Sequence, residues 1–371
     1  MKIIFNACII ILLMSVVLSG CNKPEPTDSF GKQEMFINYA DNLILPAYND
    51  YATALTNLKT AYTQFQTTTD LANLNLLRTA FLTAYEIWQY CEIYDKLPPA
   101  ETVTSIDNNN YYPSRKDSIE AYISRGTTSL SFIQSRIKSD KGLPAIDYLL
   151  FNNALTENEI LALFSTNTNA TAYKNYVGAL IDNCINVNNS ILSTWTNYRE
   201  VFINSLGTDA AGSISLMVNA IAQRTDNFKR HQVGIPAGYQ GNVSTVYILP
   251  AAVQAYNSNK SIEFMLLTLN NMKNVLNGKN STDGKGILDY IRTLNVTSTF
   301  GGNLADDILA QIDVCIAKAN ACGSNYSETI STNKPKADEL FLEAKKLLVL
   351  IKVDVPSALG VSITYTDSDG D

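Results

Sequence analysis

One stretch of the chain predicts a helix with a buried face: Lys141-Gly-Leu-Pro-Ala-Ile-Asp-Tyr-Leu-Leu-Phe151. Gly142 and Pro144 mark its start, because a proline in the first turn removes no hydrogen bond that the helix needs. Asp147 lies near the helix N-terminus, where free backbone N–H groups and the helix dipole stabilise a carboxylate. Apolar side chains at helical spacing form the buried face: Ile146, Leu149 and Leu150.

The same apolar spacing recurs along most of the chain and predicts an all-α protein. It is found at 36–43, where Pro46 stops or kinks the helix, and then at 51–65, 74–88, 118–137, 173–202, 214–228, 260–276, 304–319 and 335–352. Several short-linked helices in succession are typical of antiparallel bundles. We therefore expect two helical bundles, an N-terminal one over 31–165 and a C-terminal one over 166–371, with an irregular segment at 232–258.

An internal similarity suggests that the two bundles arose by duplication. Residues 145–150 (Ala-Ile-Asp-Tyr-Leu-Leu) match residues 261–266 (Ser-Ile-Glu-Phe-Met-Leu) in the order small, Ile, acid, aromatic, aliphatic, Leu. Amphipathic helices often look alike, so a chance match is the alternative. If the bundles are related, Asp147 and Glu263 hold matching positions and could meet at one interface.

The N-terminus predicts export and lipid anchoring. Lys2 and the apolar run 9–18 are typical of a signal peptide whose core is too short to span a bilayer. The run ends in Leu18-Ser-Gly-Cys21, which is typical of a bacterial lipoprotein cleavage site. We expect residues 1–20 to be removed, Cys21 to carry lipid and residues 21–30 to form a tether. The predicted location is the cell envelope, with the outer membrane as the expected membrane and the leaflet left open.

The net charge limits the classes of partner, and the cysteine positions limit the possible disulfides. The net charge of −7 argues against nucleic acid, which requires a clustered basic face. Four cysteines follow Cys21, and the nearest pair is Cys315 and Cys322. Seven residues of unbroken helix span about 10 Å, too far for a disulfide, so a bond requires the helix to end between them. Buried free thiols are the alternative.

A single histidine, His231, limits the chemistry. A catalytic zinc normally takes two or three histidine ligands, and a His-x-x-x-His pair is impossible here. The sequence contains no Gly-x-Ser-x-Gly, Cys-x-x-Cys, phosphate-binding loop or dinucleotide fingerprint. These absences leave no standard catalytic centre to assign.

Residues 142–147, Gly-Leu-Pro-Ala-Ile-Asp, resemble the Gly-x-His-x-x-Glu motif of the imelysin-like family. That family is classed as peptidase M75 and is linked to bacterial iron uptake, and this chain is similar to a divergent bacteroidete member. The resemblance implies a two-bundle fold and a binding cleft at the motif-equivalent residues Gly142, Pro144, Asp147 and Tyr148. Pro144 replaces the histidine of the motif and can neither ligate a metal nor transfer a proton.

Metal binding stays open at this stage. Asp147 is the best single candidate ligand, and oxygen-only coordination with Glu263 would suit a hard cation such as calcium better than iron. Further candidates for the cleft wall are Arg78, Tyr85, Trp88 and Glu92 on one predicted helix, and Lys229, Arg230 and His231 before a loop. The alternatives are core packing for the first group and helix capping for the second.

These observations lead to three functional hypotheses. The first is a non-catalytic binding lipoprotein for uptake of iron or an iron-bearing ligand, with its site in the cleft between the bundles. The second is a metallopeptidase-like enzyme, which needs a group to replace the missing histidine. The third is a surface lipoprotein that binds a partner protein of the envelope and whose ancestral site has decayed.

Overall fold

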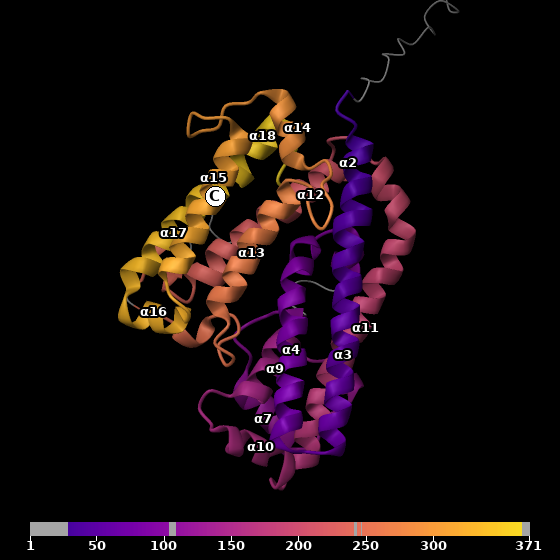
Figure 1. Cartoon of the computed structure of the whole chain (residues 1–371), viewed down its shortest axis with the longest axis vertical. Helices are drawn as coiled ribbons and strands as arrows, with labels where there is room; N and C mark the ends of the chain where they lie inside the picture. The colour runs from indigo at the N-terminus through magenta and orange to yellow at the C-terminus, as the bar shows by residue number, and fades with distance from the viewer. Residues whose placement is uncertain (1–28, 104–108, 241–242, 246, 366–371) are drawn as a thin grey trace, which may run out of the picture. The chain divides into compact units, whose positions relative to one another are not determined.

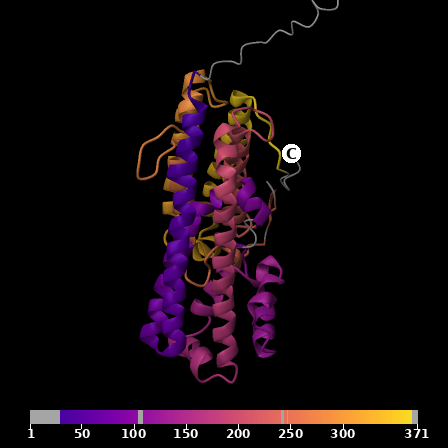
Figure 2. The same cartoon turned by 90° about the vertical axis from the view of Figure 1, so that its right-hand side faces the viewer.

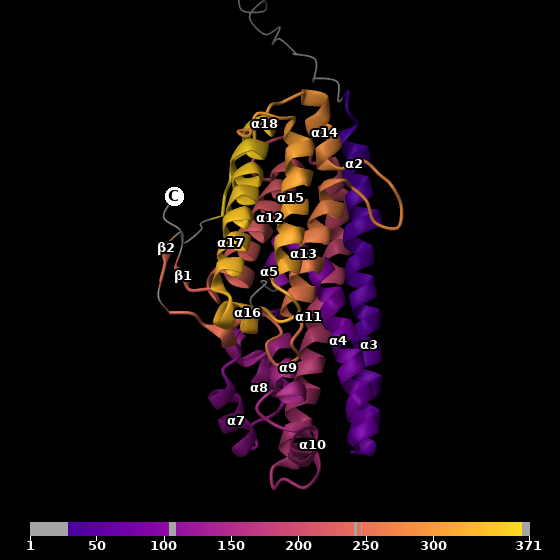
Figure 3. The ribbon, with the colours of Figure 1, turned by 60° about the vertical axis from the view of Figure 1, so that its left-hand side comes forward.

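The computed structural model describes residues 29–103, 109–240, 243–245 and 247–365, and most of these are helical (Figure 1). The all-α prediction is confirmed. Within the described ranges the strands are β1 (Tyr239–Gln240) and β2 (Val243–Ser244), which pair antiparallel (Figure 3). The predicted signal peptide and the lipidation site Cys21 lie outside the described residues. No described helix is both long enough and apolar enough to cross a membrane.

Three long helices form the first part of the bundle: α3 (Leu45–Thr67), α4 (Leu71–Cys91) and α11 (Ala170–Asn204). The turn between α3 and α4 ends at Asp70, whose side chain caps α4 by accepting a hydrogen bond from the Asn73 N–H at 2.8 Å. α3 packs against both other helices (Figures 1 and 2). Gly178 permits the close approach of α11, since a Cβ there would collide with the Tyr62 ring.

Short helices follow α4 and connect it with α11. They are η2 (Glu92–Tyr94), α5 (Pro98–Val103), α7 (Lys116–Ser124), α8 (Leu130–Gln134), η3 (Lys138–Asp140), α9 (Leu143–Phe151) and α10 (Glu157–Ser165). The expected single helix at 118–137 is therefore wrong. It breaks at Gly126, whose φ of +69° is a left-handed conformation that ends helices.

The second part of the bundle contains α12 (Ser213–Asn227), α13 (Ser261–Leu276), α15 (Leu304–Ala321) and α17 (Lys334–Val349), with α13, α15 and α17 side by side in Figure 3. Shorter elements complete it: α2 (Lys32–Asn38), η5 (Pro250–Ala252), α14 (Ile287–Leu294), α16 (Tyr326–Thr332) and α18 (Val355–Leu359). α13 also packs on α4, and residues from Gln33 onward form one compact unit. The boundary at 165 and the duplication stay predictions.

Three π-helical segments occur among the described residues, and a proline stands two positions after the end of each. They are η1 (Tyr39–Ile44) before Pro46, η4 (Phe228–Gly234) before Pro236 and η6 (Leu350–Asp354) before Pro356. Proline has no N–H to donate to the carbonyl four residues earlier, so the regular ladder is interrupted and a wider turn forms. The irregular segment predicted at 232–258 therefore begins inside η4.

The N-terminal end of the bundle is fixed by contacts with a distant loop. Asn38 Nδ2 donates to the carbonyls of Gly278 and Lys285 at 2.7 and 3.0 Å. The Tyr39 hydroxyl donates to the Val275 carbonyl at 2.7 Å and accepts from the Ile287 N–H at 3.0 Å. Asn38, the last residue of α2, thus holds the 278–285 loop, and Tyr39, the first residue of η1, is bonded to α13 and α14 on either side of that loop.

Candidate functional site

The start of α9 has the geometry that its sequence predicts. Gly142 is the residue before the helix and has a φ of +77°, which glycine adopts without strain, and Pro144 follows in the first turn. The side chains of residues 143–150 are all buried, so this helix buries every face and not only one. Asp147 is consequently inside the protein, with 2% of its surface exposed.

Asp147 is held by the segment that precedes α13. Its Oδ2 accepts hydrogen bonds from the backbone N–H of Asn257 at 3.0 Å and from Asn257 Nδ2 at 3.2 Å. Burial raises the pKa of Asp147, and hydrogen bonds from Ser258 and Asn257 oppose that rise. The motif carboxylate thus connects α9 to the C-terminal half of the chain.

Lys116 and Asp147 line a cavity of about 20 Å³, together with Pro144 and Tyr112. Lys116 Nζ is 5.2 Å from the centroid of the Tyr148 ring and 5.3 Å from that of Tyr256. Burial lowers the pKa of Lys116, and the negative charge of Asp147 opposes this effect. The cavity therefore places an ammonium between two aromatic rings and near the motif carboxylate.

A second small cavity, of about 30 Å³, lies on the other side of Tyr112. Arg224 and Glu92 form an ion pair in its wall, with 2.6 Å between Nη2 and Oε2. Asn110 Nδ2 donates to Glu92 Oε1 at 2.8 Å, and the Tyr85 hydroxyl donates to Asn110 Oδ1 at 2.7 Å. His231 also lines this cavity.

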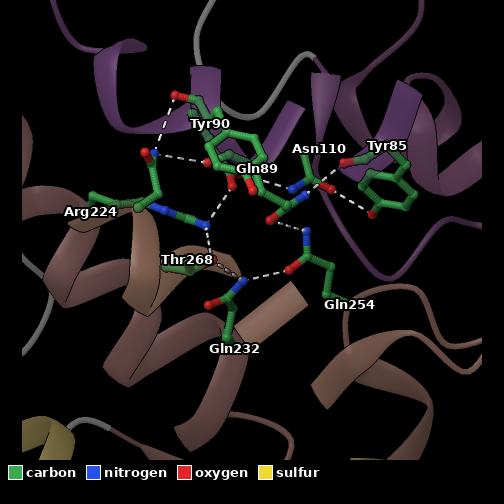
Figure 4. A network of polar contacts seen from close by, with 10 residues as sticks. Tyr85, Gln89, Tyr90, Asn110, Arg224, Gln232, Gln254 and Thr268 are labelled. Atoms are coloured by element: carbon green, nitrogen blue, oxygen red, sulfur yellow. Dashed lines mark hydrogen bonds and ion pairs between the residues drawn. The ribbon is translucent and has the colours of Figure 1, made fainter. Parts of the chain in front are cut away.

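A chain of amide side chains continues from this ion pair into the core (Figure 4). Arg224 Nη2 donates to Thr268 Oγ1 at 2.7 Å, and Gln232 Nε2 donates to the same oxygen at 3.2 Å. Gln232 Nε2 also donates to Gln254 Oε1 at 2.5 Å, and Gln254 Nε2 donates to Gln89 Oε1 at 3.2 Å. The network joins α4 with α12, η4, α13 and the segment before α13.

The comparisons with known proteins agree with this architecture. The family model described as Imelysin, peptidase M75, matches residues 44–351. The chain belongs to the imelysin family. No curated protein matches it.

Two crystal structures have a similar fold. One is an imelysin-like protein from Psychrobacter arcticum 273-4, with a TM-score of 0.69 and 16% identity over 90% of this chain and 97% of that chain. The other is a candidate iron-regulated protein A precursor from Parabacteroides distasonis ATCC 8503, with a TM-score of 0.70 and 15% identity over 88% of this chain and 95% of that chain.

Several predicted site residues of this imelysin family member lie together. Pro144 and Asp147 of the motif line the cavity that contains Lys116, and the Tyr148 ring lies against Lys116. Glu92 and His231 line the second cavity, and Tyr85 is bonded to Asn110 in its wall. The π-helix η4 carries both His231 and Gln232, and π segments of this kind are frequent at functional sites.

Other candidates lie elsewhere. Arg78 donates to the Leu150 carbonyl at 2.8 Å and pairs with Glu157, which places it at the far end of α9. Trp88 is fully buried beside Tyr51, with 5.1 Å between ring centroids. Three charged candidates remain. Lys229 pairs with Asp226 at 3.1 Å, Glu263 pairs with Lys260 at 2.5 Å, and Arg230 is half-buried.

The sequence alone did not identify Arg224, Lys116, Asn110, Gln232 or Gln254. Arg224 gave a weak signal, since it interrupts the apolar spacing of α12 seven residues before His231. The amide residues Asn110, Gln232 and Gln254 gave no signal in the sequence, because uncharged polar residues are common on exposed helix faces.

The donor set of the imelysin motif in this chain does not fit a directly bound cation. N–H groups of Asn257 bond to Asp147 Oδ2, the Lys116 ammonium lies near that carboxylate, and a guanidinium neutralises Glu92. Asp147 and Glu263 have different partners, and the described residues include no group of three His, Cys, Asp or Glu that could hold a metal ion. Calcium or iron at Asp147 stays a prediction.

Proposed function

We propose that this protein is a non-catalytic member of the imelysin family that binds an iron-bearing ligand at the bacterial cell envelope, as part of iron uptake. The supporting observation is the buried Glu92–Arg224 ion pair and its amide network, which borders a cavity lined by His231. The name of the Parabacteroides distasonis relative, an iron-regulated protein precursor, supports the link to iron. A lipid on Cys21 would anchor the protein to the membrane.

The buried Glu92–Arg224 pair and its amide network support a binding role, because buried polar groups of this kind give the fold no clear advantage in stability. Charged side chains are rarely buried, and well-packed apolar residues often stabilise a core as well as an ion pair does. Glu92 and Arg224 expose only 2% and 4% of their side chains, and Gln232 and Gln254 are equally buried. Such a cluster beside a cavity is the arrangement expected where a polar ligand group enters.

The size and charge of the two cavities indicate which part of a ligand would enter. Volumes of about 30 and 20 Å³ each suit a group the size of a water molecule. Each cavity has a cation beside a carboxylate, Arg224 with Glu92 and Lys116 with Asp147, and the N–H groups of the two cations can also bond to an oxygen of a ligand. The ligand would therefore insert a carboxylate or hydroxyl while an iron centre stays outside, as in an iron–carboxylate chelate.

The motif supports a non-catalytic role. Pro144 occupies the place of the histidine of the family motif, and its side chain has no group that donates or accepts a proton. His231, the one histidine of the sequence, lies beside the Glu92–Arg224 pair and not beside Asp147. Binding without turnover is the role these residues can perform.

Equilibrium dialysis of the full chain against radioactive ferric citrate tests this proposal. We expect retention of iron with citrate and none with an equally dilute ferric ion without a chelator. His231→Gln should weaken retention roughly tenfold, since it changes the cavity wall. Arg230→Gln, the neighbouring substitution outside the cavity lining, is the matched control. Equal retention by wild type and His231→Gln would contradict the proposed site.

The small size of both cavities favours a second candidate, a surface lipoprotein that binds a partner protein. Side chains fill most of the space around Asp147, as expected for a decayed site. Iron accumulation in a deletion strain distinguishes the two candidates. A lower cellular iron content under iron limitation supports uptake, whereas an unchanged content supports the partner-binding role.

A further inference from the structure

A larger cavity of about 320 Å³ lies apart from the two described above, among α3, α4, α13 and the 278–285 loop. Its lining combines aromatic rings with amide side chains and one charge of each sign. The residues used in the argument are Asp50, Tyr90, Tyr94, Asn271, Asn274 and Lys279. The volume lies within the range of small-molecule sites.

The rim of this cavity is held in place by hydrogen bonds. The 278–285 loop is attached through Asn38, as described above. Asn280 Nδ2 donates to the Asn42 carbonyl at 3.0 Å. In a regular helix the N–H four residues later would bond to this carbonyl, but that residue is Pro46, which has no N–H. The cavity is therefore formed before any ligand arrives, which lowers the entropic cost of binding.

Two nearly buried side chains in the lining have unused hydrogen-bonding capacity. Tyr94 exposes 2% of its surface, and no hydrogen bond links its hydroxyl to any described residue. Asn271 exposes 6%, and its Nδ2 donates to the carbonyls of Gln89 and Tyr90 at 3.4 and 3.3 Å. These partners are acceptors, so they orient the amide and leave Asn271 Oδ1 as an acceptor for another group. Neither atom is sealed from solvent, so a molecule in the cavity can bond to both.

The charges in the cavity argue against an ionic ligand. Asp50 carries a negative charge and Lys279 a positive one, and Lys279 is also paired with Asp283 at 3.3 Å. Neither sign dominates. Hydroxyl groups both donate and accept, which suits the Tyr94 hydroxyl, Asn271 Oδ1 and the free amide of Asn274. The ring of Tyr90 supplies an apolar surface for C–H groups.

We propose that this cavity is a second binding site, for a neutral polyhydroxylated molecule of the sugar class. The proposal stands independently of the iron-related function, although Asn271 touches the amide network through the carbonyls of Gln89 and Tyr90 (Figure 4). Hydroxyls of the sugar ring would bond with Tyr94, Asn271 and Asn274, while the face of the ring packs on Tyr90.

Saturation-transfer NMR with N-acetylglucosamine as the probe tests this site on the full chain. We expect binding, with an affinity roughly fivefold lower in Tyr94→Phe, which removes one hydroxyl and keeps the packing. Asn274→Ala should show a similar loss. The matched controls, Tyr247→Phe on an exposed tyrosine and Asn270→Ala on the same helix, should bind as wild type does.

Charged analogues of the same ring complete the test. Glucosamine and glucuronate should bind more weakly than N-acetylglucosamine. Absence of binding by the wild type, unchanged binding by Tyr94→Phe, or tighter binding of either charged sugar would overturn the proposal. His231→Gln should leave sugar binding unchanged, and Tyr94→Phe should leave iron citrate retention unchanged, so failure of one proposal is distinguishable from failure of the other.

Discussion

Arg224 and Glu92 approach to 2.6 Å between Nη2 and Oε2, and both side chains are almost completely removed from water. Glu92 begins η2 directly after α4, and Arg224 lies in α12, so the pair joins helices from the two parts of the bundle. Each charge is compensated mainly by the other and by neighbouring amides, which makes the pair sensitive to loss of either member.

Glu92→Gln should therefore destabilise the fold strongly. Removing one member of a buried ion pair leaves the other charge uncompensated and costs about 3–5 kcal/mol in the free energy of unfolding. Urea denaturation followed by circular dichroism measures this loss. Asp313→Asn breaks the more exposed pair with Lys273, whose side chains are 56% and 35% exposed, and should cost less than about 1 kcal/mol. Similar small losses in both variants would contradict the importance of the buried pair.

Asp147→Asn should change how stability depends on pH. Burial raises the pKa of Asp147 above its ordinary value of 3.8, so its contribution to stability is fully present below the unfolded-state pKa. That contribution is lost as the pH rises through the folded-state pKa. The free energy of unfolding of the wild type minus that of the variant should therefore fall as the pH increases. Denaturation at a series of pH values measures it, and a difference that stays constant or rises would refute the prediction.

The cysteines should react slowly in the folded protein. The sequence allowed either a disulfide between Cys315 and Cys322 or free thiols. In the structure the four cysteines are buried free thiols: Cys91, Cys184, Cys315 and Cys322. Burial raises the pKa of Cys184 and Cys315 to about 12 and that of Cys322 to about 11, so little thiolate is present at neutral pH. Alkylation mapped by mass spectrometry should label them only after unfolding. A crosslinked peptide containing Cys315 and Cys322 would disprove this state.

Cys21→Ala should release the protein from the membrane. The lipoprotein cleavage site predicted at 18–21 makes Cys21 the attachment point for lipid, and the described helices offer no membrane span to replace it. Fractionation of cells should find wild type with membranes and the variant in the aqueous fraction. Ser19→Thr, a conservative change in the cleavage sequence, serves as the control. A variant that stays with the membranes would show that Cys21 is not the anchor.

Much of the helical architecture could be predicted because it depends on local spacing. The stripes at 260–276, 304–319 and 335–352 correspond to α13, α15 and α17, and the family motif was located at the start of α9. The break at Gly126 was missed, since one glycine inside an apolar stripe is often tolerated in a helix. The π-helical segments were missed as well, although their prolines were visible, because a proline can also end a helix or kink it.

The candidate site was predictable only in part, for a different reason. Asp147, Glu92 and His231 stood out as charged or titratable residues in otherwise apolar helices. Their partners did not, because Asn257 reaches Asp147, and Asn110 and Arg224 reach Glu92, only after segments far apart in the chain have packed together. Trp88 shows the converse, since an aromatic residue at helical spacing can equally belong to the core, as this one does.

The attachment of Asn38 and Tyr39 to residues 275–287 has a consequence for biosynthesis. The partners are separated by about 240 positions, so the beginning of the bundle emerges from the ribosome long before the residues that satisfy its buried polar groups. Contacts of such long range slow folding and leave nascent segments open to misassembly. The segment around Asn38 and Tyr39 must therefore wait for most of the chain, and C-terminal truncations before residue 287 should leave its packing incomplete.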